Sequence, residues 1–116
     1  MSKDARPYLN DILTRVEMIR EFSASGRDEF FSSRKTQESI IRCFEVIGEA
    51  VKRLPAKLTG LDPSTSWSSY AGFRDILIHQ YEKVDLEVVW SAVENDLVAL
   101  ETGVHRLLEI LDSSAD

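Results

Sequence analysis

The segment from Gly72 to Tyr81 joins groups capable of acid–base and phosphate chemistry to a run of apolar residues. It reads Gly-Phe-Arg-Asp-Ile-Leu-Ile-His-Gln-Tyr, so Arg74, His79 and Tyr81 lie in a stretch apolar enough to be buried. Burying such groups is costly unless they find partners. Histidine can serve as acid or base near neutral pH, and arginine can hold a phosphate through two parallel hydrogen bonds. The segment is therefore a candidate site for phosphate chemistry.

Helical geometry, at about 100° per residue, sorts this segment into three faces. The face predicted to meet the core carries Phe73, Ile76, Leu77 and Gln80. A second stripe, spaced over nearly two turns, carries Arg74, Ile78 and Tyr81. His79 lies on a third flank, four residues after Asp75, so we expect Asp75 to hydrogen-bond the imidazole and to fix its tautomer. One face of this helix would pack against the core, and another would present polar side chains at the surface.

A structural explanation of the same residues is an ordinary polar network inside a helical bundle. An arginine and a histidine in one helix are a common coincidence, so Arg74 and His79 alone do not define a function. The rest of the chain has to decide between the two interpretations.

Length and composition favour one soluble domain over residues 1–116. The hydrophobic fraction of 43% and the charged fraction of 29% are typical of globular proteins. No apolar run approaches the roughly 18 residues of a membrane span, and no signal-peptide core follows the N-terminus, so we expect a cytoplasmic protein that does not bind membranes. A single cysteine, Cys43, excludes an internal disulfide. One cysteine and two distant histidines give no recognisable metal site.

The net charge of −6 is unfavourable for a protein that binds nucleic acid, but the charge is unevenly distributed. Between Arg27 and Lys57 there are seven Lys/Arg against five Asp/Glu. From Asp85 to Asp116 there are eight acidic residues against one basic. Any contact with RNA should therefore come from the middle of the chain.

Hydrophobic periodicity predicts four main helices: one reaching about Phe22, one from about Lys35 to Leu54, one containing Trp67 and the polar segment, and one running without interruption from Asp85 past Leu107. Residues 27–34 are expected to form a short helical turn, and residues 56–66 a loop. Gly48 lies inside the second helix, where it costs about 1 kcal/mol relative to alanine, so we expect it to allow the close approach of another helix. The predicted fold is all-α, an antiparallel four-helix bundle with a short extra turn.

Ordered sequence elements along nearly the whole chain resemble the HepT-like HEPN-domain toxins, the DUF86 family. The motif of that family is Arg-x4-His-x-Tyr, matched here by Arg74, His79 and Tyr81. The supporting elements are Tyr-Leu-x-Asp-Ile at residues 8–12, Ile-Gly-Glu-Ala at residues 47–50, Trp67, Gly72, and Val84-Asp85 followed by Trp90. Each element is weak alone, and the ordered set is specific.

The resemblance implies the toxin of a toxin–antitoxin pair. Such a toxin would be a metal-independent endoribonuclease, without a cofactor, that acts on RNA, with tRNA as the expected substrate. Arg74 and His79 would be catalytic, and Glu49 and Asp75 would support them. The antitoxin would be an MNT-type nucleotidyltransferase that transfers AMP to Tyr81. Because one histidine cannot be acid and base in one transition state, we expect a homodimer that brings two Arg74–His79 pairs into one cleft.

Two positions depart from the family pattern. Asp75 replaces the more common asparagine, and Glu82 replaces an apolar or aromatic residue. Both add negative charge near the proposed site, which would weaken phosphate binding. These two departures leave open a second interpretation, in which the chain is a non-catalytic helical protein that binds substrate for a minimal nucleotidyltransferase. A third possibility is a helical dimer whose polar stripe only specifies pairing.

Overall fold

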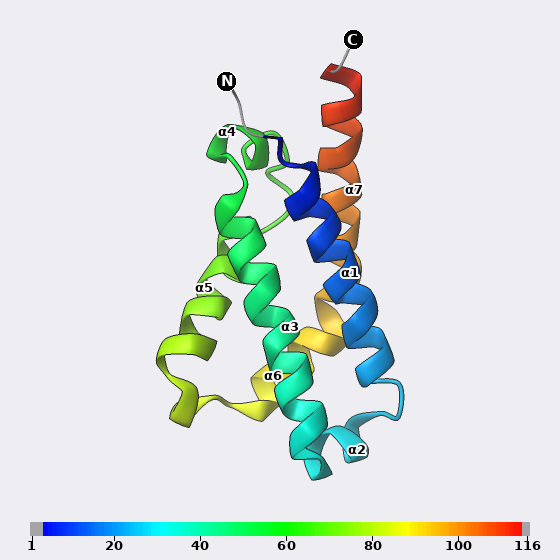
Figure 1. Cartoon of the computed structure of the whole chain (residues 1–116), viewed down its shortest axis with the longest axis vertical. Helices are drawn as coiled ribbons and strands as arrows, with labels where there is room; N and C mark the ends of the chain where they lie inside the picture. Colours follow the sequence, from blue (N-terminus) through cyan, green and yellow to red (C-terminus); the bar gives the residue numbers. More distant parts are fainter. Residues whose placement is uncertain (1–3, 115–116) are drawn as a thin grey trace.

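The apolar stripes of the sequence form helices that run alternately in opposite directions along the long axis of the molecule (Figure 1). The structure is a computed structural model, and it describes residues 4–114. The four principal helices are α1 (Arg6–Phe22), α3 (Arg34–Arg53), α5 (Trp67–His79) and α7 (Leu97–Ser114). Shorter elements are α2 (Arg27–Ser32), α4 (Ala56–Thr59), the 3₁₀ turn η1 (Tyr81–Lys83) and α6 (Leu86–Asn95). Residues 4–114 contain no strand, which confirms the all-α prediction.

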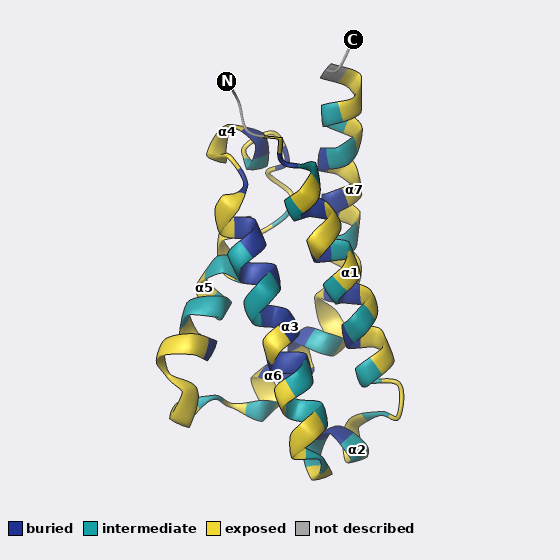
Figure 2. Ribbon diagram, in the orientation of Figure 1, coloured by how far each residue is buried: buried dark blue, intermediate teal, exposed yellow. Residues whose placement is uncertain are grey.

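Helix α3 is the central element and packs against both α1 and α5 (Figure 1). The inward-facing residues of the long helices are buried, as the dark faces in Figure 2 show. Those with no exposed surface include Leu9, Ile12, Val16, Ile19, Ile40, Leu100, Val104 and Leu107. Each such side chain contributes about 1.5–3 kcal/mol by leaving water, so this core holds α3 in a fixed position between its neighbours.

Helix α2 confirms the predicted short turn. Phe30 is completely buried, and its ring lies 5.0 Å from that of Phe31 and 5.1 Å from that of Trp90 on α6. This aromatic cluster packs α2 against α6.

The prediction of one long C-terminal helix is wrong, because α6 ends at Asn95 and α7 begins at Leu97. Asp96 lies between them with φ −107° and ψ −19°, and α6 crosses obliquely below α7 (Figure 1). The Tyr70 hydroxyl of α5 donates to the Asp96 carbonyl at 3.4 Å. Asp85 caps the N-terminus of α6, since its carboxylate accepts from the Glu87 amide at 2.9 Å.

The segment from 56 to 66, predicted as a loop, contains the short helix α4 and a buried carboxylate. Asp62 is 1% exposed, accepts from Arg106 of α7 at 2.7 Å and from the Ser64 hydroxyl at 2.8 Å. These bonds hold the connection between α3 and α5 against α7. Within residues 4–114, no helix is both long and apolar enough to cross a membrane.

Candidate functional site

Gly48 sets the position of the motif arginine. A Cβ added to Gly48 would overlap the Arg74 side chain and would lie 2.8 Å from the Tyr70 carbonyl oxygen. The two backbones therefore meet here, which confirms the expected close approach at Gly48. Arg74 extends from this contact across the surface of α3.

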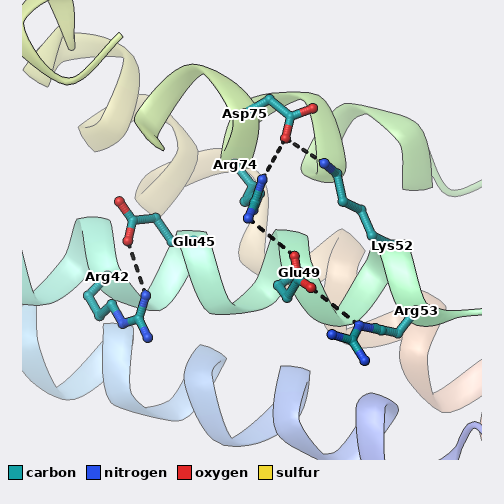
Figure 3. Close-up of polar contacts among 7 residues, drawn as sticks. All are labelled: Arg42, Glu45, Glu49, Lys52, Arg53, Arg74 and Asp75. Atoms are coloured by element: carbon teal, nitrogen blue, oxygen red, sulfur yellow. Dashed lines mark hydrogen bonds and ion pairs between the residues drawn. The ribbon is translucent and has the colours of Figure 1, made fainter. Parts of the chain in front are cut away.

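Two carboxylates hold the Arg74 guanidinium (Figure 3). One terminal nitrogen lies 3.4 Å from Glu49 Oε2, and the other lies 3.0 Å from Asp75 Oδ1. The side chain is 22% exposed, and its Nε is buried without a hydrogen-bond partner among residues 4–114. The two carboxylates therefore fix the orientation of the Arg74 guanidinium.

Two further cations extend this network. Lys52 Nζ lies 2.6 Å from Asp75 Oδ1, and Arg53 Nε lies 3.3 Å from Glu49 Oε1 (Figure 3). Hydrogen bonds from Lys52 and, next, from Arg74 lower the pKa of Asp75 below its ordinary value. The five groups carry three positive and two negative charges, so the cluster keeps a small positive excess.

The expected hydrogen bond between Asp75 and His79 is not formed in this structure, and Asp75 Oδ1 accepts from Lys52 and Arg74 instead. His79 is the last residue of α5 and is exposed. Its imidazole makes no hydrogen bond or ion pair with any residue in the described range 4–114. It is therefore accessible from solvent, and its tautomer is not fixed by Asp75.

The face of α5 predicted to meet the core is buried only in part. Leu77 is completely buried, and Phe73 packs edge-on against Phe44 at 5.4 Å. Ile76 is 47% exposed, and Gln80 is exposed as well, so their assignment to the core was wrong. The reason is that α5 packs mainly against α3, which covers one face of the helix and leaves Ile76 and Gln80 on its uncovered side.

Tyr81 does not continue the Arg74 stripe, because α5 ends at His79 and Tyr81 begins η1. Its hydroxyl donates to Glu38 Oε1 on α3 at 3.3 Å, and its side chain is 56% exposed. Arg34 contacts the same carboxylate oxygen at 3.3 Å. Tyr81 thus lies beside Arg34 rather than beside Arg74.

Arg74 opens onto a hollow of about 490 Å³ between α1, α3 and α5. Its lining includes three arginines that the sequence analysis did not single out: Arg15, Arg42 and Arg53. The excess of basic residues in the middle of the chain was the available signal for Arg42 and Arg53. Arg15 comes from α1, outside that segment, and only the packing of α1 on α3 brings it here. Residues 4–114 contain no group of three or more His, Cys, Asp or Glu side chains placed to hold a metal ion.

The protein is a small all-α bundle that holds Arg74 at a hollow lined by four arginines and three carboxylates and exposes His79 on the same helix. The family described as "Ribonuclease HepT-like" matches residues 12–107, which include every candidate site residue. The chain therefore belongs to the HepT-like ribonuclease family.

Individual relatives agree with this assignment. The "Probable ribonuclease HepT" of Thermococcus cleftensis is 37% identical over 92% of this chain and 98% of its own length. A Methanocaldococcus jannaschii protein named "Gamma-glutamylcyclotransferase and putative RNase" is 38% identical over 98% of this chain. This chain spans 52% of the length of that second relative. No solved structure matches the chain significantly.

Proposed function

We propose that this protein is a toxin that cleaves RNA as a metal-independent endoribonuclease, with tRNA in the cytoplasm as its substrate. The observation that carries the proposal is the placement of Arg74 and His79 on α5 of a chain in a ribonuclease family. Arg74 is held at the edge of a hollow that three further arginines line, and His79 is exposed and unpaired within residues 4–114.

The reaction would be an internal transesterification. The ribose 2′-oxygen attacks the adjacent phosphorus, the 5′-oxygen leaves, and a 2′,3′-cyclic phosphate forms. One group must take the proton from the 2′-hydroxyl, another must protonate the 5′-oxygen, and a cation must stabilise the charged phosphorane. Arg74 is the cation, and its contacts with Glu49 and Asp75 would be exchanged for phosphate oxygens. His79 would perform one of these two proton transfers.

The second proton carrier would come from a second copy of the chain. A two-fold homodimer would place two Arg74–His79 pairs in one cleft and provide both an acid and a base. Ile78 supports such an interface, since this apolar side chain is 38% exposed and lines the same hollow as Arg74.

Activity would be silenced by a nucleotidyltransferase antitoxin of the MNT type. The Tyr81 oxygen would attack the α-phosphorus of ATP, pyrophosphate would leave, and the phenolic proton would be lost, giving an AMP ester. Tyr81 is 56% exposed and accessible to such an enzyme. The added phosphate would be placed beside Arg34, which shares Glu38 with Tyr81, and the adenosine would obstruct the surface of α3.

A second candidate function is a non-catalytic helical partner that presents substrate to a nucleotidyltransferase. The observation that favours it is the pairing of Arg74 with two carboxylates, one of them the unusual Asp75. A guanidinium neutralised in this way binds phosphate less strongly.

The deciding experiment incubates the pure, unmodified dimer with total tRNA in the presence of EDTA, beside the variants His79→Ala and Arg74→Ala. Cleavage by the wild type that leaves 2′,3′-cyclic phosphate ends, and is lost in both variants, is the expected result. If the folded, dimeric wild type cleaves nothing, the nuclease proposal fails and the partner function takes its place.

A further inference from the structure

Three hollows along α3 meet at one residue, Arg42. The first is the hollow of about 490 Å³ that contains Arg74. The second, of about 460 Å³, contains Tyr81, and the third, of about 620 Å³, lies between α1 and α3. Arg42 lines all three, so the hollows adjoin one another at this residue.

The hollow between α1 and α3, which we call the α1/α3 hollow, is the most positive of the three. Its lining carries four cations and one carboxylate: Arg15, Arg34, Lys35, Arg42 and Glu38. This excess of three positive charges contrasts with the net charge of −6 for the whole chain. A local positive field on an acidic protein indicates a site for a polyanion.

Two of these cations have no carboxylate partner. Neither Arg15 nor Lys35 forms an ion pair with any described residue of the chain. Arg42 has only a long contact of 3.4 Å with Glu45, and its side chain is 68% exposed. Surface pairs of this kind contribute roughly 0–1 kcal/mol, so Arg42 can exchange its partner at little cost.

Arg15 and Arg42 lie close together over an apolar floor. Burial raises the pKa of the Cys43 thiol, and the guanidinium groups of Arg15 and Arg42 beside it oppose that rise. Met18 and Phe22 of α1 complete the floor of the hollow. A cationic rim over an apolar floor matches a nucleotide, whose phosphate is charged and whose base has an apolar face.

We propose that the α1/α3 hollow is an RNA-binding subsite, which holds a nucleotide flanking the cleaved bond through Arg15 and Arg42 at its phosphate and through Met18 and Phe22 at its base. This inference rests on the proposed ribonuclease function. The Arg74 hollow shares Arg15 and Arg42 with the α1/α3 hollow, so one RNA backbone can pass from the subsite to the motif arginine. Arg15 and Arg42 bind the RNA in this arrangement and take no part in the chemical step.

The test measures binding of a labelled single-stranded RNA oligonucleotide by fluorescence anisotropy at several KCl concentrations. His79→Ala serves as the background, so that the RNA stays intact. Arg15→Gln and Arg42→Gln are added singly and together. Lys57→Gln on α4 is the matched control, because it removes one exposed positive charge and lines none of the hollows described above.

Each substitution should weaken binding roughly fivefold and should lower the slope of log affinity against log salt by about 0.7, the value for one phosphate contact on a single strand. Lys57→Gln should change the affinity and the salt slope by much less. In the wild-type background, the double variant should need more RNA to reach half of its maximal cleavage rate and should keep that maximal rate. Unchanged affinity and salt slope in the double variant would overturn the subsite.

The proposed nuclease function and the subsite can fail separately. A wild type that binds RNA through Arg15 and Arg42 without cleaving it would contradict the nuclease function and keep the subsite. A wild type that cleaves RNA, with a double variant that cleaves and binds it equally well, would contradict the subsite alone. If the double variant lost only its binding to the nucleotidyltransferase, the hollow would be a protein interface and the proposal would be wrong. Circular dichroism and thermal unfolding confirm that each variant is folded.

Discussion

Gly48 of α3 lies directly against the side chain of Arg74 of α5, with no space between them for a methyl group. A Cβ at Gly48 would come within 2.9 Å of Arg74 Cγ and within 2.8 Å of the Tyr70 carbonyl oxygen. Real side-chain carbons do not approach backbone oxygens so closely, so α5 would have to move. The glycine that weakens α3 locally is therefore what places the motif arginine at its hollow.

Gly48→Ala should destabilise the protein by about 1–3 kcal/mol, because the clash outweighs the gain of about 1 kcal/mol in helix propensity. RNA cleavage should fall at least tenfold, since a small displacement of a catalytic group is costly. Urea unfolding and the tRNA cleavage assay measure the two effects. Gly72→Ala is the matched control: it lies inside α5 with nothing within 4 Å of an added Cβ, so it should stabilise by up to about 1 kcal/mol. Equal stability changes in the two variants would contradict the role of Gly48.

Asp75→Asn should increase RNA cleavage. The substitution removes a negative charge 3.0 Å from the Arg74 guanidinium and leaves both Arg74 and Lys52 available to phosphate. We expect kcat/KM to rise roughly fivefold, the equivalent of about 1 kcal/mol in an exposed charge interaction. Stability should change by less than about 1 kcal/mol, because the lost ion pairs are exposed. Asp28→Asn on α2 is the control: it also removes one negative charge, but at a position away from the site, and should leave cleavage unchanged. Inactivity of wild type and Asp75→Asn alike would favour the non-catalytic partner function.

Tyr81→Phe should abolish AMP transfer and leave the fold intact. The hydroxyl is the proposed acceptor, and its loss removes one exposed hydrogen bond of 3.3 Å to Glu38, worth less than about 1 kcal/mol. Incubation with the nucleotidyltransferase and labelled ATP, followed by mass spectrometry, measures the modification. Tyr8→Phe, which removes a hydroxyl at the hollow of Arg74, is the matched control and should still be modified. AMP found on Tyr81→Phe would show that the acceptor lies elsewhere.

The sequence predicted the long helices because their apolar residues recur with the helical period. The first predicted helix is α1, which buries Leu9, Ile12, Val16 and Ile19, and Gly48 is a helix contact as expected. The break between α6 and α7 was missed because the apolar stripe keeps its spacing across Asp96. Asp96 has a helical conformation but is bonded to Tyr70, 26 residues away, and no local pattern contains that contact.

The sequence named candidate site residues, but it did not predict the contacts that these residues make. Spacing along a helix suggested that Asp75 would bond His79, but Lys52 of α3 competes for the same carboxylate from 23 residues away. The same limit applies to Tyr81, which the end of α5 turns toward Glu38. Helical spacing describes neighbours on one element, whereas partners on another element depend on how the helices pack.

Asp62 should make the protein sensitive to acid. Burial alone would raise the pKa of this carboxyl, but hydrogen bonds from Thr65 and Ser64 and the Arg106 guanidinium outweigh burial and hold the pKa below its ordinary value. A carboxyl with a lowered native pKa stabilises the fold above its unfolded pKa of about 3.9 and loses that contribution as the pH falls through the native pKa.

Asp62→Asn should therefore destabilise the protein by about 2 kcal/mol at pH 7, where the wild-type carboxylate is charged and paired with Arg106. The difference should shrink as the pH is lowered from about 5 to about 2, because the wild type becomes protonated while asparagine does not titrate. Urea unfolding of both proteins across this range gives the difference directly. Asp112→Asn is the control, since its ion pair with Arg6 is exposed and should contribute less than about 1 kcal/mol at any pH. A difference that stayed constant down to about pH 2 would show that Asp62 contributes through shape and hydrogen bonding, and not through its charge.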